Sequence, residues 1–310
     1  MIYKLSKNAD GFCPDVRRLL SQLDDADLYY QDYHLMHPAD VFTSIFDEVV
    51  ESGEQLAKKY LSFISNHRTS ISNEHSVESL KTDISHFLFS LSNFIAGCRS
   101  IIKSLFKKDS KESNKVLREF NKTIKNYTDY VSKMINYVKH RHRIIRSFKA
   151  TWEDKMIIGY YIEGVVQKGA IGPDPDIHKD SKCAISLNRD IPFHLGNVYF
   201  VSAALKTIVS KNFEDNKEIS SSEDDTKIFK LLSMVSDIPR YYFPDEIKKK
   251  WIRVYAEDKD NKSVLIELDS KKKPDNFSPH ILDINLSFKV GVRNRTLVPP
   301  YFYGVGKLKC

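Results

Sequence analysis

Cysteine is scarce in this sequence, and its positions exclude two common kinds of cysteine-based structure. The four cysteines, Cys13, Cys98, Cys183 and Cys310, are far apart and form no Cys-x-x-Cys pair. A disulfide-stapled fold and a zinc site built from thiolates both need closer or denser cysteines. Isolated thiols suit a reducing compartment, so we expect a cytoplasmic protein.

Long apolar runs and the common catalytic signatures are also missing. No window approaches the roughly 20 apolar residues that span a bilayer, so we expect no membrane partner. Residues 1–10 contain charges and no apolar run, and we expect no signal peptide. The sequence contains no Walker A, GxGxxG, HExxH or GxSxG pattern, which excludes enzymes that depend on those motifs.

The length of the chain predicts two domains. Its 310 residues exceed most single hydrophobic cores, and 41% hydrophobic with 29% charged residues is typical of a globular protein. We expect an α+β protein in which residues 1–150 form an antiparallel helical bundle with a basic hairpin. Residues 151–310 are expected to form a mainly antiparallel α+β domain, with an acidic flexible loop near 212–227.

Apolar residues at helical spacing predict the bundle. Residues 39–66 and 77–106 carry apolar side chains in steps of mostly three and four, which places them along one side of each helix. The two stripes are Phe42, Ile45, Phe46, Val49, Leu56, Tyr60, Phe63 and Ile64, and Val77, Leu80, Ile84, Phe87, Leu91, Phe94, Cys98, Ile101 and Leu105. Short connections favour antiparallel neighbours, so we expect at least three packed helices over residues 38–148.

After Trp152 the pattern becomes that of strands. Residues 156–167 are rich in β-branched and aromatic side chains, and a turn at Lys168-Gly169 leads to a partner strand beginning at Ala170. Further strands are expected at 183–187, 251–256, 263–268, 281–290 and 301–305, and a helix at 198–211. Residues 228–235 fit either a short helix or a buried apolar run.

The most distinctive stretch is Lys115–Phe148, which we expect to form one long helix with an apolar side and a basic side. From Arg99 to Lys149 there are 15 Lys and Arg against 4 Asp and Glu, a net charge of +11. The whole chain carries +7, so the remainder carries −4. A concentrated positive surface favours RNA, DNA or an acidic protein surface as partner, although a lysine-rich helix face is also ordinary solvated surface.

This helix supplies the candidate binding and catalytic residues. The candidate phosphate ligands are Lys122, Lys133, Lys139, Arg141, Arg143 and Arg146, and such contacts carry little base-sequence information. His140 is a candidate general acid or base, with Asn136 one turn earlier and Arg143 available to stabilise developing charge. The alternative is a basic helix end that interacts favourably with its own dipole.

A helical bundle whose last long helix carries Arg, His and other polar residues resembles the HEPN group. Many HEPN proteins are ribonucleases of toxin or antiviral systems, and their motif is an arginine, four to six residues of any kind, and a histidine. No histidine stands at this spacing after Arg141, and no arginine stands at this spacing before His140 or His142, so we expect the motif to be absent. The resemblance implies a helical ribonuclease fold and transfers no catalytic residue.

A second candidate site is the segment that contains Asp174, Asp176 and His178. In an extended segment alternate side chains point the same way, so these groups could converge on a divalent metal, with His194 completing the shell. Such an ion could activate water for hydrolysis. A proline–aspartate turn held by its own hydrogen bonds explains the same residues without a metal, and we expect no other cofactor.

Three functions fit these observations. The first is nucleic-acid binding, RNA before DNA, along the basic face of the 115–146 helix. The second is a HEPN-like or metal-dependent ribonuclease that uses His140 or the Asp174–His178 segment. The third is a scaffold or subunit of a larger assembly, in which the basic hairpin docks on an acidic protein surface. A homo-oligomer is compatible with each.

Overall fold

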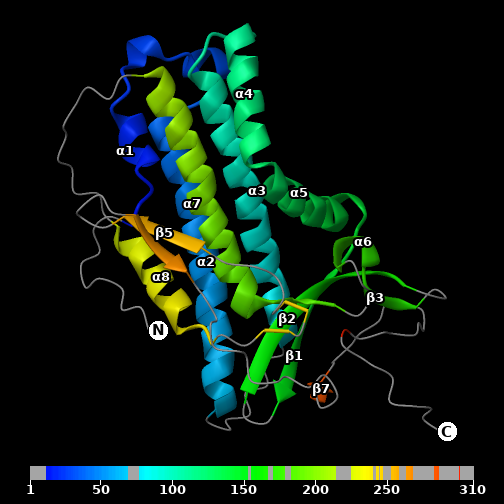
Figure 1. Ribbon diagram of the computed structural model, residues 1–310. Coiled ribbons are helices and arrows are strands. Elements are labelled where there is room, and N and C mark those ends of the chain that lie inside the picture. Colours follow the sequence, from blue (N-terminus) through cyan, green and yellow to red (C-terminus); the bar gives the residue numbers. More distant parts are fainter. Residues whose placement is uncertain are drawn as a thin grey trace, which may run out of the picture.

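Two long helices, α2 (Pro38–Arg68) and α3 (Leu80–Ser104), lie antiparallel along one another (Figure 1). The computed structural model describes residues 12–68, 77–152, 155–166, 170–178, 183–213, 225–239, 242–243, 245–246, 253–257, 263–267, 283–285 and 300. Phe42 packs on Phe94, and Ser52 bonds Ser90, which shows the antiparallel direction. The two expected apolar stripes are buried apart from the half-buried Ile45, Phe63 and Val77, so both predicted helices are confirmed.

Helices from both halves of the chain build one bundle. The others are α1 (Val16–Ser21), α4 (Lys111–Thr123), α5 (Lys125–His140), α6 (Pro175–His178), α7 (Leu187–Asn212) and α8 (Thr226–Asp237), with single 3-10 turns η1 (Asp25–Asp27), η2 (Tyr30–Tyr33) and η3 (Val77–Ser79). α7 packs against α1, α3 and α4, and α8 packs against α2. Leu195 and Leu205 of α7 share an apolar core with Phe87 of α3, so the two expected parts of the chain are joined by a common core.

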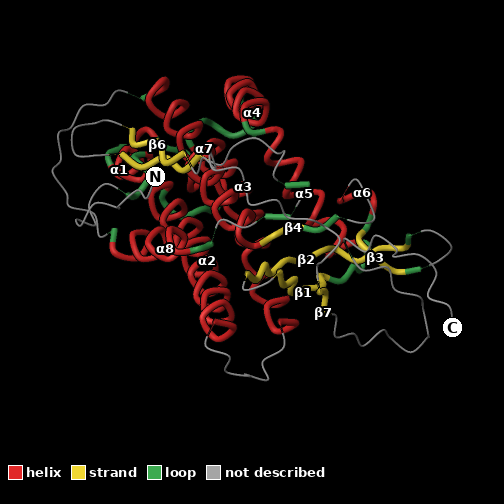
Figure 2. The backbone as a smooth tube through the Cα atoms, turned by 60° about the horizontal axis from the view of Figure 1, so that its bottom comes forward, coloured by secondary structure: helices red, strands yellow, loops and turns green. Residues whose placement is uncertain are grey.

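A small antiparallel sheet lies against the lower ends of α3 and α7 in Figure 1. Its strands are β1 (Ile145–Trp152), β2 (Lys155–Val165), β3 (Ile171–Pro173), β4 (Ile185–Ser186) and β7 (Asp283–Asn285). The order is β3-β2-β1-β7, and β4 also pairs with β2. The strands β5 (Arg253–Glu257) and β6 (Ser263–Glu267) form a separate hairpin (Figure 2). Helices and antiparallel strands together confirm the α+β class.

β2 is buried on both faces, which explains its nearly continuous apolar sequence. Tyr160 and Ile162 face the helical core, whereas Ile157 and Tyr161 pack with Phe243 on the other side. Gly159 lies where β2 closely approaches its neighbours, because a Cβ there would be 2.6 Å from the Phe243 ring and 2.8 Å from the Ile185 carbonyl oxygen. The expected strand at 156–167 is therefore confirmed.

The expected single helix over Lys115–Phe148 is wrong, because this stretch forms two helices and the beginning of a strand. α4 ends at Thr123, α5 begins at Lys125, and Ile124 between them has φ −94° and ψ 7°. The Thr123 hydroxyl donates to the Glu119 carbonyl oxygen (3.1 Å), a contact that bends helices. α5 ends at His140, after which His142 has a left-handed φ of 51°.

Residues 145–152 are a strand because they pair with β2. Ile145 lies opposite Ile162, and Ala150 lies opposite Ile157. Ile145 follows Val138 by seven residues, which is also the spacing of two apolar residues on one side of a helix. In the structure Ile145 is buried in the sheet, so this spacing does not distinguish a helix from a strand here. The expected domain boundary after residue 150 also falls inside β1.

α7 begins at Leu187, well before the expected start at residue 198, and it contains Pro192. Proline normally ends a helical pattern, so the first turns of α7 escape a sequence-based prediction. The helical interpretation of residues 228–235 is confirmed by α8. The strands expected at 251–256 and 263–268 are confirmed by β5 and β6, which pair antiparallel. Most of the acidic stretch 212–227, most of 281–290 and the expected strand at 301–305 lie outside the described residues. Among the described helices, none is both long and apolar enough to cross a bilayer.

Candidate functional site

Four cations form a stripe along the exposed side of α4. Lys111, Lys115, Arg118 and Lys122 are separated by four, three and four residues, which keeps them on one side of the helix, and all four are exposed. The stripe is about 17 Å long at the usual helical rise. We call these four residues the α4 cation stripe.

The acidic residues closest to the stripe in sequence lie beside it. Glu112 and Glu119 are seven residues apart and share a neighbouring flank of α4. Glu119 pairs with Lys211 of α7 (3.6 Å), and Asp129 of α5 pairs with Lys125 (2.5 Å). Glu119 and Asp129 therefore bind cations outside the α4 cation stripe, and among the described residues no ion pair involves the four cations of the stripe.

The three arginines expected to bind phosphate have protein partners instead. Arg141 stacks on the Tyr137 ring, 4.2 Å from its centroid, and lies 3.8 Å from an Asp176 oxygen. The Arg143 Nε lies 3.4 Å from Asp174 Oδ2. Arg146 lies on β1 and is buried, so it is part of the folded interior.

Arg146 forms the strongest of these contacts. Its Nε donates to Glu163 Oε2 (2.8 Å), and its Nη1 lies 3.4 Å from Glu78 Oε1. Burial works against the charged guanidinium, but the hydrogen bond and charge of Glu163 outweigh it and raise the pKa of Arg146. A guanidinium held in this way is a structural ion pair.

The remaining expected side chains at the end of α5 face solvent. Asn136, Lys139 and His140 are exposed, as is Lys122 of the α4 cation stripe. The exposed Lys133 donates to the Asp176 carbonyl oxygen (2.5 Å). Arg143, the expected partner of His140 and Asn136, lies beside the carboxylate of Asp174.

Asp174, Asp176 and His178 form a capped turn. Asp174 Oδ1 accepts from the Asp176 N–H (3.0 Å), and its carbonyl oxygen accepts from the His178 N–H (2.9 Å) to close the single turn of α6. His178 Nε2 accepts from the Ile162 N–H of β2 (3.0 Å). The expectation of an extended segment is therefore wrong, and the turn explanation accounts for these contacts.

The two carboxylates of this turn lie in different surroundings. Asp174 is buried beside Arg143, whereas Asp176 is exposed and accepts from the Tyr137 hydroxyl (2.6 Å). Within the described ranges, no group of three or more His, Cys, Asp or Glu side chains is placed to hold a metal ion. His194, the fourth expected ligand, lies in the bundle core.

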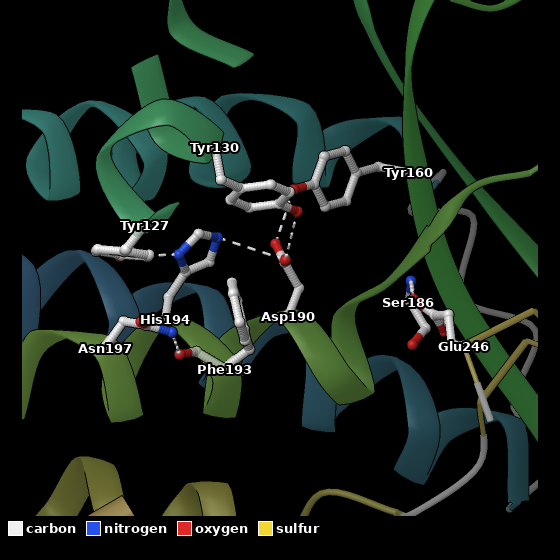
Figure 3. Close-up of polar contacts among 9 residues, drawn as sticks. All are labelled: Tyr127, Tyr130, Tyr160, Ser186, Asp190, Phe193, His194, Asn197 and Glu246. Atoms are coloured by element: carbon white, nitrogen blue, oxygen red, sulfur yellow. Dashed lines mark hydrogen bonds and ion pairs between the residues drawn. The ribbon is translucent and has the colours of Figure 1, made fainter. Parts of the chain in front are cut away.

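His194 belongs to a buried polar cluster that sequence reasoning missed (Figure 3). Tyr127 and Tyr130 come from α5, Tyr160 from β2, and Asp190 and His194 from α7. His194 Nδ1 lies 3.0 Å from the Tyr127 hydroxyl, and His194 Nε2 lies 3.4 Å from Asp190 Oδ1. The Tyr160 hydroxyl donates to Asp190 Oδ2 (2.7 Å). The cluster thus links α5, the sheet and α7.

The charge of Asp190 is stabilised although its side chain is almost fully buried. Burial raises the pKa of this carboxyl, but attraction to His194 and the hydrogen bond from the Tyr160 hydroxyl outweigh the effect. The net result is a pKa below the ordinary value. An ionised Asp190 next to an imidazole ring fixes the orientation of that ring, as carboxylates do for catalytic histidines.

One sequence signal for this cluster exists outside the basic helix. Arg189 is followed after four residues by His194, which is the spacing of the HEPN motif, so the expected absence of this spacing is wrong. Arg189 is half-buried, and its guanidinium stacks on the Phe193 ring, 5.0 Å from the centroid. Arg68 and His75 also show a permitted spacing, but His75 lies outside the described residues. Because a proline normally marks the end of a helix, Pro192 prevented a sequence-based prediction of the helix that carries Arg189 and His194.

Glu246 is another buried carboxylate, and it lies beside Ser186, just before α7 (Figure 3). Its oxygens accept from the Ser186 N–H (2.9 Å) and the Phe243 N–H (3.1 Å). Burial is the dominant effect and raises the pKa of Glu246 to about 7, although these hydrogen bonds favour the ionised form. This side chain therefore ties residues 243–246 to the first turn of α7.

Comparison of the chain with protein-family models, with curated proteins and with solved structures found no match in any of the three. Two features of the described residues remain as the physical basis for a function. One is the exposed α4 cation stripe, and the other is the buried Asp190–His194 cluster.

Proposed function

We propose that the protein binds nucleic acid, RNA before DNA, through the α4 cation stripe. Four exposed cations along three helical turns match a chain of phosphates, each of which carries a negative charge. Lys122 belongs both to the expected basic face and to this stripe, whereas Arg143 and Arg146 bind carboxylates. We place the protein in the cytoplasm because its four cysteines are far apart in the sequence and form no Cys-x-x-Cys pair.

The observation that carries this proposal is the unneutralised charge of the stripe. Glu119, the carboxylate beside Lys115 and Lys122, pairs with Lys211 of another helix. Lysine side chains that extend into water lose little hydration when they approach a phosphate, and binding releases the counterions of the nucleic acid. The expected interaction is sensitive to salt and largely insensitive to base sequence.

The experiment is fluorescence anisotropy of a labelled single-stranded RNA at several salt concentrations. The test variant is Lys115→Ala with Lys122→Ala, and the charge-matched control is Lys58→Ala with Lys81→Ala, on α2 and α3. Each lost phosphate contact lowers the slope of log K against log salt by about 0.7 for a single strand. We expect a lower slope and affinity in the test variant and wild-type binding in the control.

Equal losses in both variants, or no binding at low salt, would overturn the proposal. A stoichiometric complex with an acidic protein that survives nuclease treatment would assign the stripe to a protein partner instead. Duplex DNA measured under the same conditions tests the preference for RNA.

A second candidate function is RNA cleavage, and the Asp190–His194 pair favours it. A histidine oriented by a carboxylate can take the proton of a ribose 2′-hydroxyl that attacks the neighbouring phosphate. Arg189 stands at the HEPN spacing before His194, and an arginine stabilises charge that develops on phosphate. His194 is fully buried, so cleavage requires that α5 move away from α7 to admit the substrate.

Denaturing gels of the same binding samples, with and without a chelator, test this second function. Cleavage through His194 needs no metal, so it survives the chelator and is lost in Arg189→Ala. Cleavage through His140 is lost in His140→Ala. Cleavage that the chelator abolishes would point to a metal at Asp174 or Asp176. RNA that stays intact in all samples removes the second candidate and leaves binding alone.

A further inference from the structure

We infer that Phe200 of α7 is a stacking platform for bases of single-stranded RNA held by the α4 cation stripe. The inference rests on the proposed function and adds the class of ligand to it. Phe200 is 39% exposed, which is unusual for a phenyl ring because it has no polar atom to hydrate.

The position of Phe200 follows from two contacts on the same face of α7. Phe193 packs against Tyr127 of α5, and Lys211 pairs with Glu119 of α4. At 100° per residue, Phe193, Phe200 and Lys211 point within about 20° of one another. Phe200 therefore faces the same side as these two contacts and lies between them along the helix.

The ring is left uncovered by the bend between α4 and α5. Glu119 contacts Lys211 near the end of α7, and Tyr127 contacts His194 near its beginning. The chain from Glu119 to Tyr127 therefore runs antiparallel to α7. Ile124, where the helix bends, is thus near the level of Phe200. In Figure 1, α5 turns away from the bundle after this point, and α7 remains in front. A straight helix would have continued along α7 beside the ring.

Two cations of the stripe lie next to Glu119, the residue of α4 that contacts α7. Lys115 and Lys122 are four residues before and three residues after Glu119, so their side chains neighbour its side chain on the helix surface. From the Glu119–Lys211 contact, Lys122 and Phe200 lie in the same direction because the two helices are antiparallel. The helical rise to each residue then places them roughly 12 Å apart along the helix axes. A short length of extended single strand bridges that distance.

The chemistry of a cation row beside an exposed ring selects unpaired nucleotides. Proteins that bind single strands combine a positive track for the phosphates with aromatic rings on which bases stack. A duplex keeps its bases stacked on one another, so it can use the α4 cation stripe but not Phe200. The geometry points to a preference for single-stranded over duplex RNA of the same length.

The test compares Phe200→Ala with Tyr29→Ala, measured with an unstructured single-stranded RNA and a duplex RNA. Tyr29 is a matched control because it is 40% exposed and lies among Asp24, Asp25 and Asp27, which repel phosphate. We expect Phe200→Ala to weaken single-strand binding by about 5- to 100-fold, with an unchanged salt slope. Duplex binding and both affinities of Tyr29→Ala stay at the wild-type level.

A second variant reports stacking directly in the folded protein. Phe200→Trp retains an aromatic ring, so it binds like wild type, and stacked bases quench its indole fluorescence. Tyr29→Trp shows no such quenching. If wild-type protein binds RNA with the expected salt slope but Phe200→Ala binds equally well, or Phe200→Trp is not quenched, the inference is overturned and the proposed function stands. If wild-type protein shows no salt-dependent binding, the proposed function itself is overturned.

Discussion

The guanidinium of Arg146 and the carboxylate of Glu163 lie diagonally across two paired strands, with 2.8 Å between Nε and Oε2. Both side chains are largely buried. We expect Arg146→Ala to lower the free energy of unfolding by about 3 kcal/mol, because it leaves a buried carboxylate unpaired. Urea denaturation measures the loss.

The same variant separates a structural arginine from a phosphate ligand. RNA affinity and the salt slope of Arg146→Ala should equal those of wild type at a temperature where both are folded. Lys139→Ala is the control for stability, since an exposed lysine contributes less than about 0.5 kcal/mol. A reduced salt slope in Arg146→Ala would show that this arginine reaches phosphate.

The adjacent residues Tyr160 and Tyr161 should respond in opposite ways to loss of the hydroxyl group. Tyr160 donates to the ionised Asp190, so Tyr160→Phe is expected to cost about 1.5–3 kcal/mol of unfolding free energy. The buried Tyr161 hydroxyl has no hydrogen-bond partner in the described part of the chain, so Tyr161→Phe should be neutral or stabilising. Equal losses in thermal denaturation would contradict the hydrogen-bond assignment.

The stability contributed by Asp190 should be lost only in acid. Its folded-state pKa is lower than the ordinary value, so its contribution is present above the ordinary carboxyl pKa and disappears as the pH falls through the lower folded value. Chemical denaturation of wild type and Asp190→Asn across this range measures the effect. The difference between the two proteins should shrink as the solution becomes more acidic.

Glu246 should act in the opposite direction. Its folded-state pKa of about 7 is higher than the ordinary 4.5, so its contribution is complete below pH 4.5 and is lost as the pH rises through 7. The loss is on the order of 3 kcal/mol. Glu246→Gln cannot ionise and should remove this pH dependence, at a constant cost of about 1 kcal/mol for one lost acceptor. An identical pH profile for both proteins would refute the assignment.

Gly164 should be intolerant of any side chain, because a Cβ there would lie 2.4 Å from Asp174 Oδ2 and 2.7 Å from Asp174 Cβ. We expect Gly164→Ala to displace the turn of α6, weaken the Arg143–Asp174 pair and cost about 1–3 kcal/mol. Hydrogen exchange of residues 171–178 and thermal denaturation measure these effects.

Asp174→Asn separates the turn from a metal site. The asparagine retains an oxygen that can accept the Asp176 N–H but loses the charge that pairs with Arg143. A chelator should leave the melting temperature of wild type unchanged if Asp174 acts as a cap. A rise in melting temperature on addition of Mn²⁺ that Asp174→Asn abolishes would instead show metal binding.

Patterns that are complete within one element could be read from the sequence. The apolar stripes of α2 and α3 repeat over many turns, and the doubly buried β2 is a continuous apolar run. Lys122 and the concentration of positive charge could be found in the same way. Each of these signals depends on residues close in sequence and on the periodicity of one backbone conformation.

The remaining features depend on partners that are distant in sequence. Ile145 fits a helical pattern, but pairing with Ile162 makes it part of a strand. Asp190 and His194 acquire their surroundings from Tyr127 and Tyr160, which are more than 25 residues away along the chain. Pro192 would normally mark the end of a helix, whereas the packed bundle accommodates it within α7.

The sequence by itself determined that this is an α+β protein with long amphipathic helices and a strongly basic central segment. Only the tertiary structure decided which of those cations face solvent. Arg143 and Arg146 pair with the carboxylates of Asp174 and Glu163, whereas no carboxylate in the described part of the chain pairs with the α4 cation stripe. The reason is physical: charge is a property of the residue, but its availability depends on which groups folding brings within a few ångströms of it.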